Sequence, residues 1–262
     1  MKPIGLFLFL STAACALGQV IVGFDTDRGG SYNLAAQSGV RTAIVDALPN
    51  ATFSFTSSLS DAVFSSAAGV VLMSPSSNVT AINALTIAEQ DALRAFVDRG
   101  GFAVLLTDNN ALDALESANR SFLSPFGLNT AGTYQQSTLS VINPTGNPIS
   151  NGPFGTVTSL AGIAQGGLTG LPDAFKPLAQ FSGGQIAAGY FASNDLKVGS
   201  GAVLVVADAN VFHNTWATAE NYDLLSNFVS FAAVPEPSTI SLLLLGSGAA
   251  GAMAWRKRRR RR

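Results

Sequence analysis

The chain has 262 residues, of which 47% are hydrophobic and 12% are charged, and its formal net charge is −1. It contains one cysteine and one histidine, which excludes a disulfide framework and a zinc site built from several histidines. The region between residues 19 and 233 holds 15 acidic and seven basic residues. Its net charge is therefore near −8, which argues against nucleic acid as a partner.

Residues 1–18 are typical of a secretory signal peptide. Lys2 supplies the positive charge, residues 4–10 form the apolar core, and small residues at the end of the segment fit a cleavage site. Cys15 lies within this segment, so its removal leaves an exported chain without a thiol. Lipidation of Cys15 is the alternative, although Thr12 stands where a lipoprotein signal carries leucine.

Residues 19–233 are predicted to form one α/β domain. Short apolar runs rich in β-branched residues predict buried strands at 20–24, 51–56, 69–73, 102–106 and 202–207. Amphipathic patterns between the strands predict helices over 31–48, 87–99, 111–119 and 222–231. Strands that alternate with helices imply a mostly parallel sheet with helices on both faces, which gives three layers.

The segment from about 128 to 200 breaks this regular alternation. Gly, Pro, Asn, Ser and Thr are dense in it, while residues 138–142 and 185–191 alternate in hydrophobicity as antiparallel hairpins do. We therefore expect a β-rich insertion before the last strand of the sheet.

The most distinct helix start lies at Thr86. Glu89 follows three residues later, as a capping box requires, and the pair Gly100 and Gly101 ends the helix. The apolar side chains expected to face the core are Ile87, Leu93, Phe96 and Val97.

The C-terminal segment 234–262 has three parts. The first is a triplet that proline keeps extended and exposed, formed by Pro235, Glu236 and Pro237. Residues 238–255 carry no charge and are just long enough for a separate membrane helix. A basic membrane stop over 256–262 holds that end on the cytoplasmic side, and it begins with Arg256, Lys257 and Arg258.

These three parts, in this order and spacing, resemble the PEP-CTERM sorting signal of Gram-negative bacteria. The resemblance implies that exosortase, a membrane-embedded cysteine protease-transpeptidase, recognises the triplet and cleaves near it. It also implies export across the inner membrane by the secretion machinery, anchoring by the C-terminal helix, and a cell-surface or extracellular location after processing. Such proteins are linked to exopolysaccharide and biofilm matrix, so extracellular polysaccharide is an implied partner. An ordinary single-span anchor is the alternative.

The body of the chain resembles class I glutamine-amidotransferase-like domains, and in particular their noncatalytic relatives. The resemblance rests on the Asp-Arg-Gly-Gly run at 98–101, the Asn-Pro-Ile-Ser-Asn-Gly-Pro loop at 147–153 and the late strand that ends at Asp208. Catalytic members use a cysteine on a tight turn after a strand, but the matching turn here, at 74–76, reads Ser-Pro-Ser. The resemblance therefore implies a flavodoxin-like α/β fold without the family's activity.

Polar residues follow three of the predicted strands, and they are Asp25 with Asp27, Asp108 with Asn109, and Asp208. In open α/β sheets, ligands bind outside the carboxyl ends of the strands. Carboxylate and amide oxygens suit Ca²⁺ or Mg²⁺, so these residues are candidates for a cation or polar-ligand site, and we expect no other cofactor. The alternative is that they cap helices and form turns.

Two functions are consistent with these patterns. The first is a noncatalytic binding or structural module at the envelope or in the matrix. The second is a secreted hydrolase of ester or glycosidic bonds that uses Ser74 and His213 with Asp208, or paired carboxylates at the strand ends. Ser74 lacks the Gly-x-Ser-x-Gly turn that exposes such a nucleophile, so we favour the first.

Overall fold

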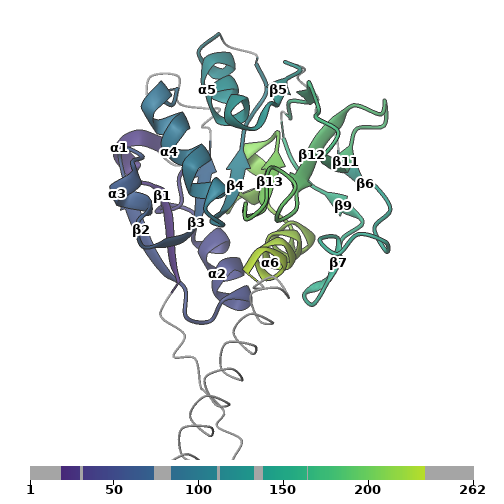
Figure 1. Cartoon of the computed structure of the whole chain (residues 1–262). Coiled ribbons are helices and arrows are strands. Elements are labelled where there is room, and N and C mark those ends of the chain that lie inside the picture. Colours follow the sequence, from purple (N-terminus) through teal and green to yellow (C-terminus); the bar gives the residue numbers. More distant parts are fainter. Residues whose placement is uncertain are drawn as a thin grey trace, which may run out of the picture.

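The computed structural model describes residues 19–29, 32–73, 84–110, 113–132, 138–163 and 165–233 (Figure 1). The predicted signal peptide, the sorting triplet, the membrane helix over 238–255 and its basic end lie outside these residues. Within the described part of the chain, no helix combines the length and the apolar character that crossing a membrane requires.

A nine-stranded mixed sheet forms the centre of the domain, in the order β2-β1-β3-β4-β13-β12-β11-β6-β9. Its first five strands pair in parallel, and they are β1 (Val20–Phe24), β2 (Thr52–Thr56), β3 (Ala67–Met73), β4 (Phe102–Leu106) and β13 (Val203–Val206). The other four pair antiparallel, and they are β6 (Leu139–Val141), β9 (Ser159–Leu160), β11 (Lys176–Gln180) and β12 (Ile186–Phe191).

Helices cover both faces of the sheet because its central strands are apolar on both sides. In β3, Val71 and Met73 pack into one core and Val70 and Leu72 into the other. The first core is closed by α2 (Ser38–Ala47) and α6 (Ala219–Ala233). The second is closed by α3 (Asp61–Phe64), α4 (Ile87–Asp98) and α5 (Asp113–Leu123). The three-layer arrangement is therefore confirmed (Figure 1).

The expectation of a mostly parallel sheet is only partly correct. The β-rich segment is present, but its strands extend the central sheet beyond β13. The shorter elements are α1 (Thr26–Gly29), η1 (Ser124–Phe126), β5 (Asn129–Thr130), β7 (Asn151–Gly152), β8 (Gly155–Thr156), β10 (Leu168–Thr169) and η2 (Ala209–Phe212). Strands β5 and β10 form one separate antiparallel pair, and β7 and β8 form another.

Two predictions about helices are wrong in detail. The second helix begins at Ser38 and not at residue 31, because residues 33–37 form turns in which the Asn33 carbonyl accepts hydrogen bonds from the amides of residues 36 and 37. The capping box of α4 is confirmed, since Thr86 and Glu89 bond reciprocally. Ile87 was expected to face inward, yet it is 71% exposed because it occupies the first turn of α4, ahead of its buried face.

Helix α6 runs opposite to the parallel strands. Phe228, in its second half, packs edge-on against Phe102, the first residue of β4, with ring centroids 6.3 Å apart. The C-terminal end of α6 therefore lies at the edge where the parallel strands begin, as the beginning of β1 does (Figure 1). We call this the amino edge, and the opposite side, where those strands end, the carboxyl edge.

Candidate functional site

The carboxyl edge brings together two of the three predicted strand-end carboxylates. Strands β4 and β13 are neighbours, with Leu106 paired to Val206, so Asp108 and Asp208 follow them side by side. Both residues are fully buried. Asp25 follows β1, which β3 separates from β4, and it belongs to a different cluster.

Asp208 is held by backbone amides. Its Oδ1 accepts a hydrogen bond from the Asn210 amide at 2.7 Å, and its Oδ2 accepts one from the Ile163 amide at 2.8 Å. Burial, together with the charge of Asp108, raises the pKa of the Asp208 carboxyl well above its ordinary value. Asp208 thus caps η2 and fastens the segment around Ile163 to the sheet.

Asp108 and Asn109 belong to a second network, centred on Asn119 of α5. The Asp108 Oδ1 accepts hydrogen bonds from the backbone and side-chain nitrogens of Asn109, both at 2.7 Å. Asn119 is fully buried; its Oδ1 accepts from the Asp108 amide at 3.0 Å, and its Nδ2 donates to the Asp108 carbonyl at 2.8 Å. The loop after β4 is therefore fixed to α5.

Two glycines let a loop close over these carboxylates. A Cβ on Gly162 would lie 2.1 Å from the Asp208 Oδ2, and a Cβ on Gly166 would lie 2.5 Å from the Asp108 carbonyl oxygen. The Gly166 amide also donates to the Ala207 carbonyl at 2.7 Å. The polar residues at this point of the carboxyl edge thus bind the protein's own loops.

The predicted cation candidates are only partly assembled. Asp108, Asn109 and Asp208 lie close together. Asp27 is exposed, and Asp25 follows β1, which β3 separates from β4. Within the described ranges, no group of three or more His, Cys, Asp or Glu residues is placed to hold a metal ion. Asp208 caps η2, which agrees with the alternative that these residues cap helices and form turns.

His213 is placed differently from a catalytic histidine. Its Nδ1 accepts a hydrogen bond from the Thr215 amide at 3.2 Å, so that nitrogen has no proton to donate to Asp208. The His213 ring packs on Tyr32 with centroids 4.8 Å apart, and burial lowers the pKa of the imidazole, which is neutral at pH 7. Ser74 lies outside the described residues.

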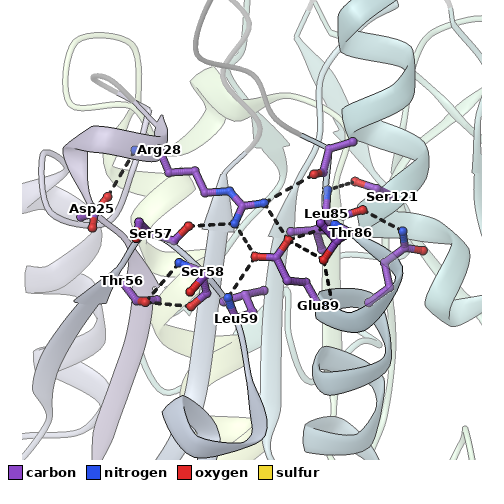
Figure 2. Close-up of polar contacts among 12 residues, drawn as sticks. Asp25, Arg28, Thr56, Ser57, Ser58, Leu59, Leu85, Thr86, Glu89 and Ser121 are labelled. Atoms are coloured by element: carbon purple, nitrogen blue, oxygen red, sulfur yellow. Dashed lines mark hydrogen bonds and ion pairs between the residues drawn. The ribbon is translucent and has the colours of Figure 1, made fainter.

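Figure 2 shows a second polar cluster at the carboxyl edge, in which the contact between Arg28 and Glu89 was not predicted. Asp25 Oδ1 accepts hydrogen bonds from the amides of Asp27 and Arg28 at 3.1 and 3.2 Å, at the start of α1. The Arg28 side chain points inward, and its guanidinium forms an ion pair with both carboxylate oxygens of Glu89. The guanidinium also donates a hydrogen bond to the Ser57 carbonyl at 2.9 Å and lies over the ring of Phe24. Both partners of the pair are less than 10% exposed.

Glu89 connects three segments of the chain through this pair, which we call the Arg28–Glu89 clamp. Besides Arg28, it accepts hydrogen bonds from the amides of Leu59, after β2, and Thr86, at the start of α4, at 3.0 and 2.9 Å. Burial alone would raise the pKa of the Glu89 carboxyl, but the hydrogen bonds from Arg28, Thr86 and Leu59 outweigh it and lower the pKa to about 2.

This shift predicts an acid-sensitive contribution to stability. Because the folded-state pKa lies below the ordinary value of 4.5, Glu89 stabilises the fold above pH 4.5 and loses this contribution as the pH falls toward 2. We expect the difference in unfolding free energy between the wild type and E89Q to shrink by about 2–3 kcal/mol over that range. Urea denaturation at a series of pH values measures it, and a difference that stays constant with pH would contradict the assignment.

Comparisons with known proteins identify the C-terminal segment. The model of the PEP-CTERM protein-sorting motif matches residues 233–260. No curated protein matches the chain.

Solved structures match the described domain at low identity. The mmIFT52 N-terminal domain is 12% identical with a TM-score of 0.61, and the match covers 83% of this chain and 99% of that one. The cytoplasmic protein STM3548 from Salmonella typhimurium is 10% identical with a TM-score of 0.51, covering 84% and 100%. A ThuA-like protein from Bacteroides uniformis is 14% identical with a TM-score of 0.44, covering 80% and 89%.

At these identities the first two matches show only a shared fold. The TM-score of the third is too low to support a conclusion. The resemblance to glutamine-amidotransferase-like domains therefore stays a prediction. The sorting resemblance is confirmed: the chain carries a PEP-CTERM protein-sorting motif, the kind of signal that exosortase recognises.

Proposed function

We propose that the chain is exported across the inner membrane by the secretion machinery and sorted by exosortase, and that its α/β domain is a noncatalytic binding or structural module. The sorting motif at residues 233–260 carries this proposal. In it, residues 238–255 anchor the chain in the inner membrane before processing, and the basic end stays on the cytoplasmic side. After processing, the domain acts at the cell surface or outside the cell.

The arrangement of the domain supports a noncatalytic role. The paired carboxylates Asp108 and Asp208 hold backbone amides and lie beneath the loop that contains Gly162 and Gly166. His213 accepts a hydrogen bond at the nitrogen that a hydrolase triad would need as a donor. The polar residues at the carboxyl edge thus hold loops in place. This is consistent with the proposed relation of the domain to noncatalytic amidotransferase-like domains.

Replacing Pro235, Glu236 and Pro237 together with alanine tests the sorting step. We expect the wild type from its native cells to lack the segment after the triplet, and the variant to keep Arg262 and remain entirely in the membrane fraction. Intact mass of the protein in membrane and medium fractions measures both. The control exchanges Arg261 and Arg262 for lysine, which preserves the charge of the membrane stop. A wild type that retains Arg262 would instead identify a plain anchor.

A further inference from the structure

A groove runs between α2 and α6 on the face of the domain formed by these two helices. Its volume is about 420 Å³, within the range of small-ligand sites. Residues spaced one helical turn apart on both helices line it, and the turn between β7 and β8 closes one side. The residues that matter for recognition are Ser38, Thr42, Asp46, Phe154, Tyr222 and Asp223.

The groove is built by close contact of the two helices. A Cβ on Gly39 would lie 2.3 Å from the Tyr222 hydroxyl, so the tyrosine ring lies directly against the backbone of α2. Ser226, which is buried, donates to the Ala43 carbonyl at 2.9 Å and ties α6 to the same stretch of α2. The floor is therefore fixed by packing and by a hydrogen bond between the two helices.

The aromatic wall is also held in place. The Phe154 amide donates to the Oδ1 of Asn227 at 2.9 Å, and the Asn227 Nδ2 donates to the Gly155 carbonyl at 3.0 Å. Asn227 is fully buried in α6, so the β7–β8 turn is anchored to the helix beside the groove. A wall that is positioned before binding lowers the entropic cost of capturing a ligand.

The negative charge of the residues that line the groove indicates which ligand charge it favours. Asp46 and Asp223 contribute carboxylates, and none of the lining residues that the structure describes is Lys or Arg. Burial, together with nearby Glu220, raises the pKa of the Asp223 carboxyl from its ordinary value. This local excess of negative charge disfavours phosphates and other anions and favours a cation, which would relieve the repulsion.

The uncharged part of the lining refines this choice. Ser38 and Thr42 supply hydroxyl groups that both donate and accept hydrogen bonds, and Tyr222 adds a phenol. The ring of Phe154 supplies an apolar face that also attracts cations. We propose that this groove binds a small hydroxylated organic ammonium ion, such as a protonated amino sugar. The inference rests on the proposed function and names the ligand class of the binding module.

Three monosaccharides with the same ring but different charge test the proposal. Glucosamine is a cation, glucose is neutral and glucuronate is an anion, and each is titrated into the full-length chain in detergent with binding followed by calorimetry or NMR. We expect glucosamine to bind at least about tenfold more tightly than glucose, the loss expected when one charge-assisted hydrogen bond is removed. Glucuronate should bind least. Equal binding of glucosamine and glucose, or no binding of glucosamine, would overturn the proposal.

Matched variants locate the site. D223N and F154A should each weaken glucosamine binding by about tenfold, since each removes one charged or aromatic contact. D91N, which changes an exposed aspartate of α4 on the other side of the sheet, should bind as the wild type does. Wild-type affinity in D223N and F154A would overturn the assignment. Tail processing, read from intact mass, is independent of these titrations, so a failed titration with a processed tail refutes only this inference.

Discussion

Replacing Glu89 with alanine is expected to destabilise the domain by about 3–5 kcal/mol, because the change leaves the buried guanidinium of Arg28 without its partner. The same change removes the acceptor for the amides of Leu59 and Thr86. The free energy of unfolding, measured by urea denaturation at pH 7, gives the effect directly.

The control for this experiment is Glu116→Ala. Glu116 also forms an ion pair, with Arg120 one turn later in α5, but both side chains are at least 40% exposed. Solvent screens such a pair, and its loss should cost less than about 1 kcal/mol. Similar costs for the two variants would mean that the Arg28–Glu89 clamp contributes no more than a surface pair.

Replacing Asn221 with leucine is expected to cost about 2–4 kcal/mol, although leucine has a similar size and leaves little cavity. Asn221 is fully buried in α6; it accepts a hydrogen bond from the Ala161 amide at 3.0 Å and donates to the carbonyls of Ala161 and Val211 at 2.7 and 2.6 Å. Leucine would leave the buried Val211 carbonyl without a partner, at about 1–3 kcal/mol, whereas the half-buried backbone groups of Ala161 would lose less because water can reach them.

Asn151→Ala serves as the matched control for this second experiment. Asn151 also contacts the backbone, by donating to the Thr145 carbonyl at 3.2 Å, but it is exposed, so water replaces the lost bond. Its cost should stay within about 0.5 kcal/mol. A loss below about 1 kcal/mol for Asn221→Leu would show that the loop at Ala161 is held mainly by other contacts.

The central strands were predictable because they are buried on both faces and read as continuous apolar runs. The antiparallel half was predicted only as hairpins, since Leu139–Val141 is short and its partner Lys176–Gln180 lies far along the chain. The order of the strands in the sheet also could not be predicted from their order along the chain. The strand order places Asp108 and Asp208 after neighbouring strands, whereas β3 separates Asp25 from them.

The Arg28–Glu89 clamp shows a different limit of prediction. The capping box identified Glu89 as a helix-start residue, but its ion-pair partner lies 61 positions earlier in the sequence, and local patterns carry no information about such a contact. The buried asparagines Asn119, Asn221 and Asn227 were missed for a related reason. Asparagine usually indicates a turn or the surface, whereas here each one is fully buried and holds the backbone of a loop.

The shared position of the beginning of β1 and the end of α6 bears on how the domain would be presented and released. In the proposed anchored state, the tether would leave the domain through residue 233 at its amino edge. The carboxyl edge with the Arg28–Glu89 clamp lies on the opposite side of the domain from that attachment point. The packing of α6 against the core ends with Phe231 and Ala232, before the sorting motif begins at residue 233. Cutting the tether near the triplet would therefore detach a finished domain, and release into the medium would require no refolding.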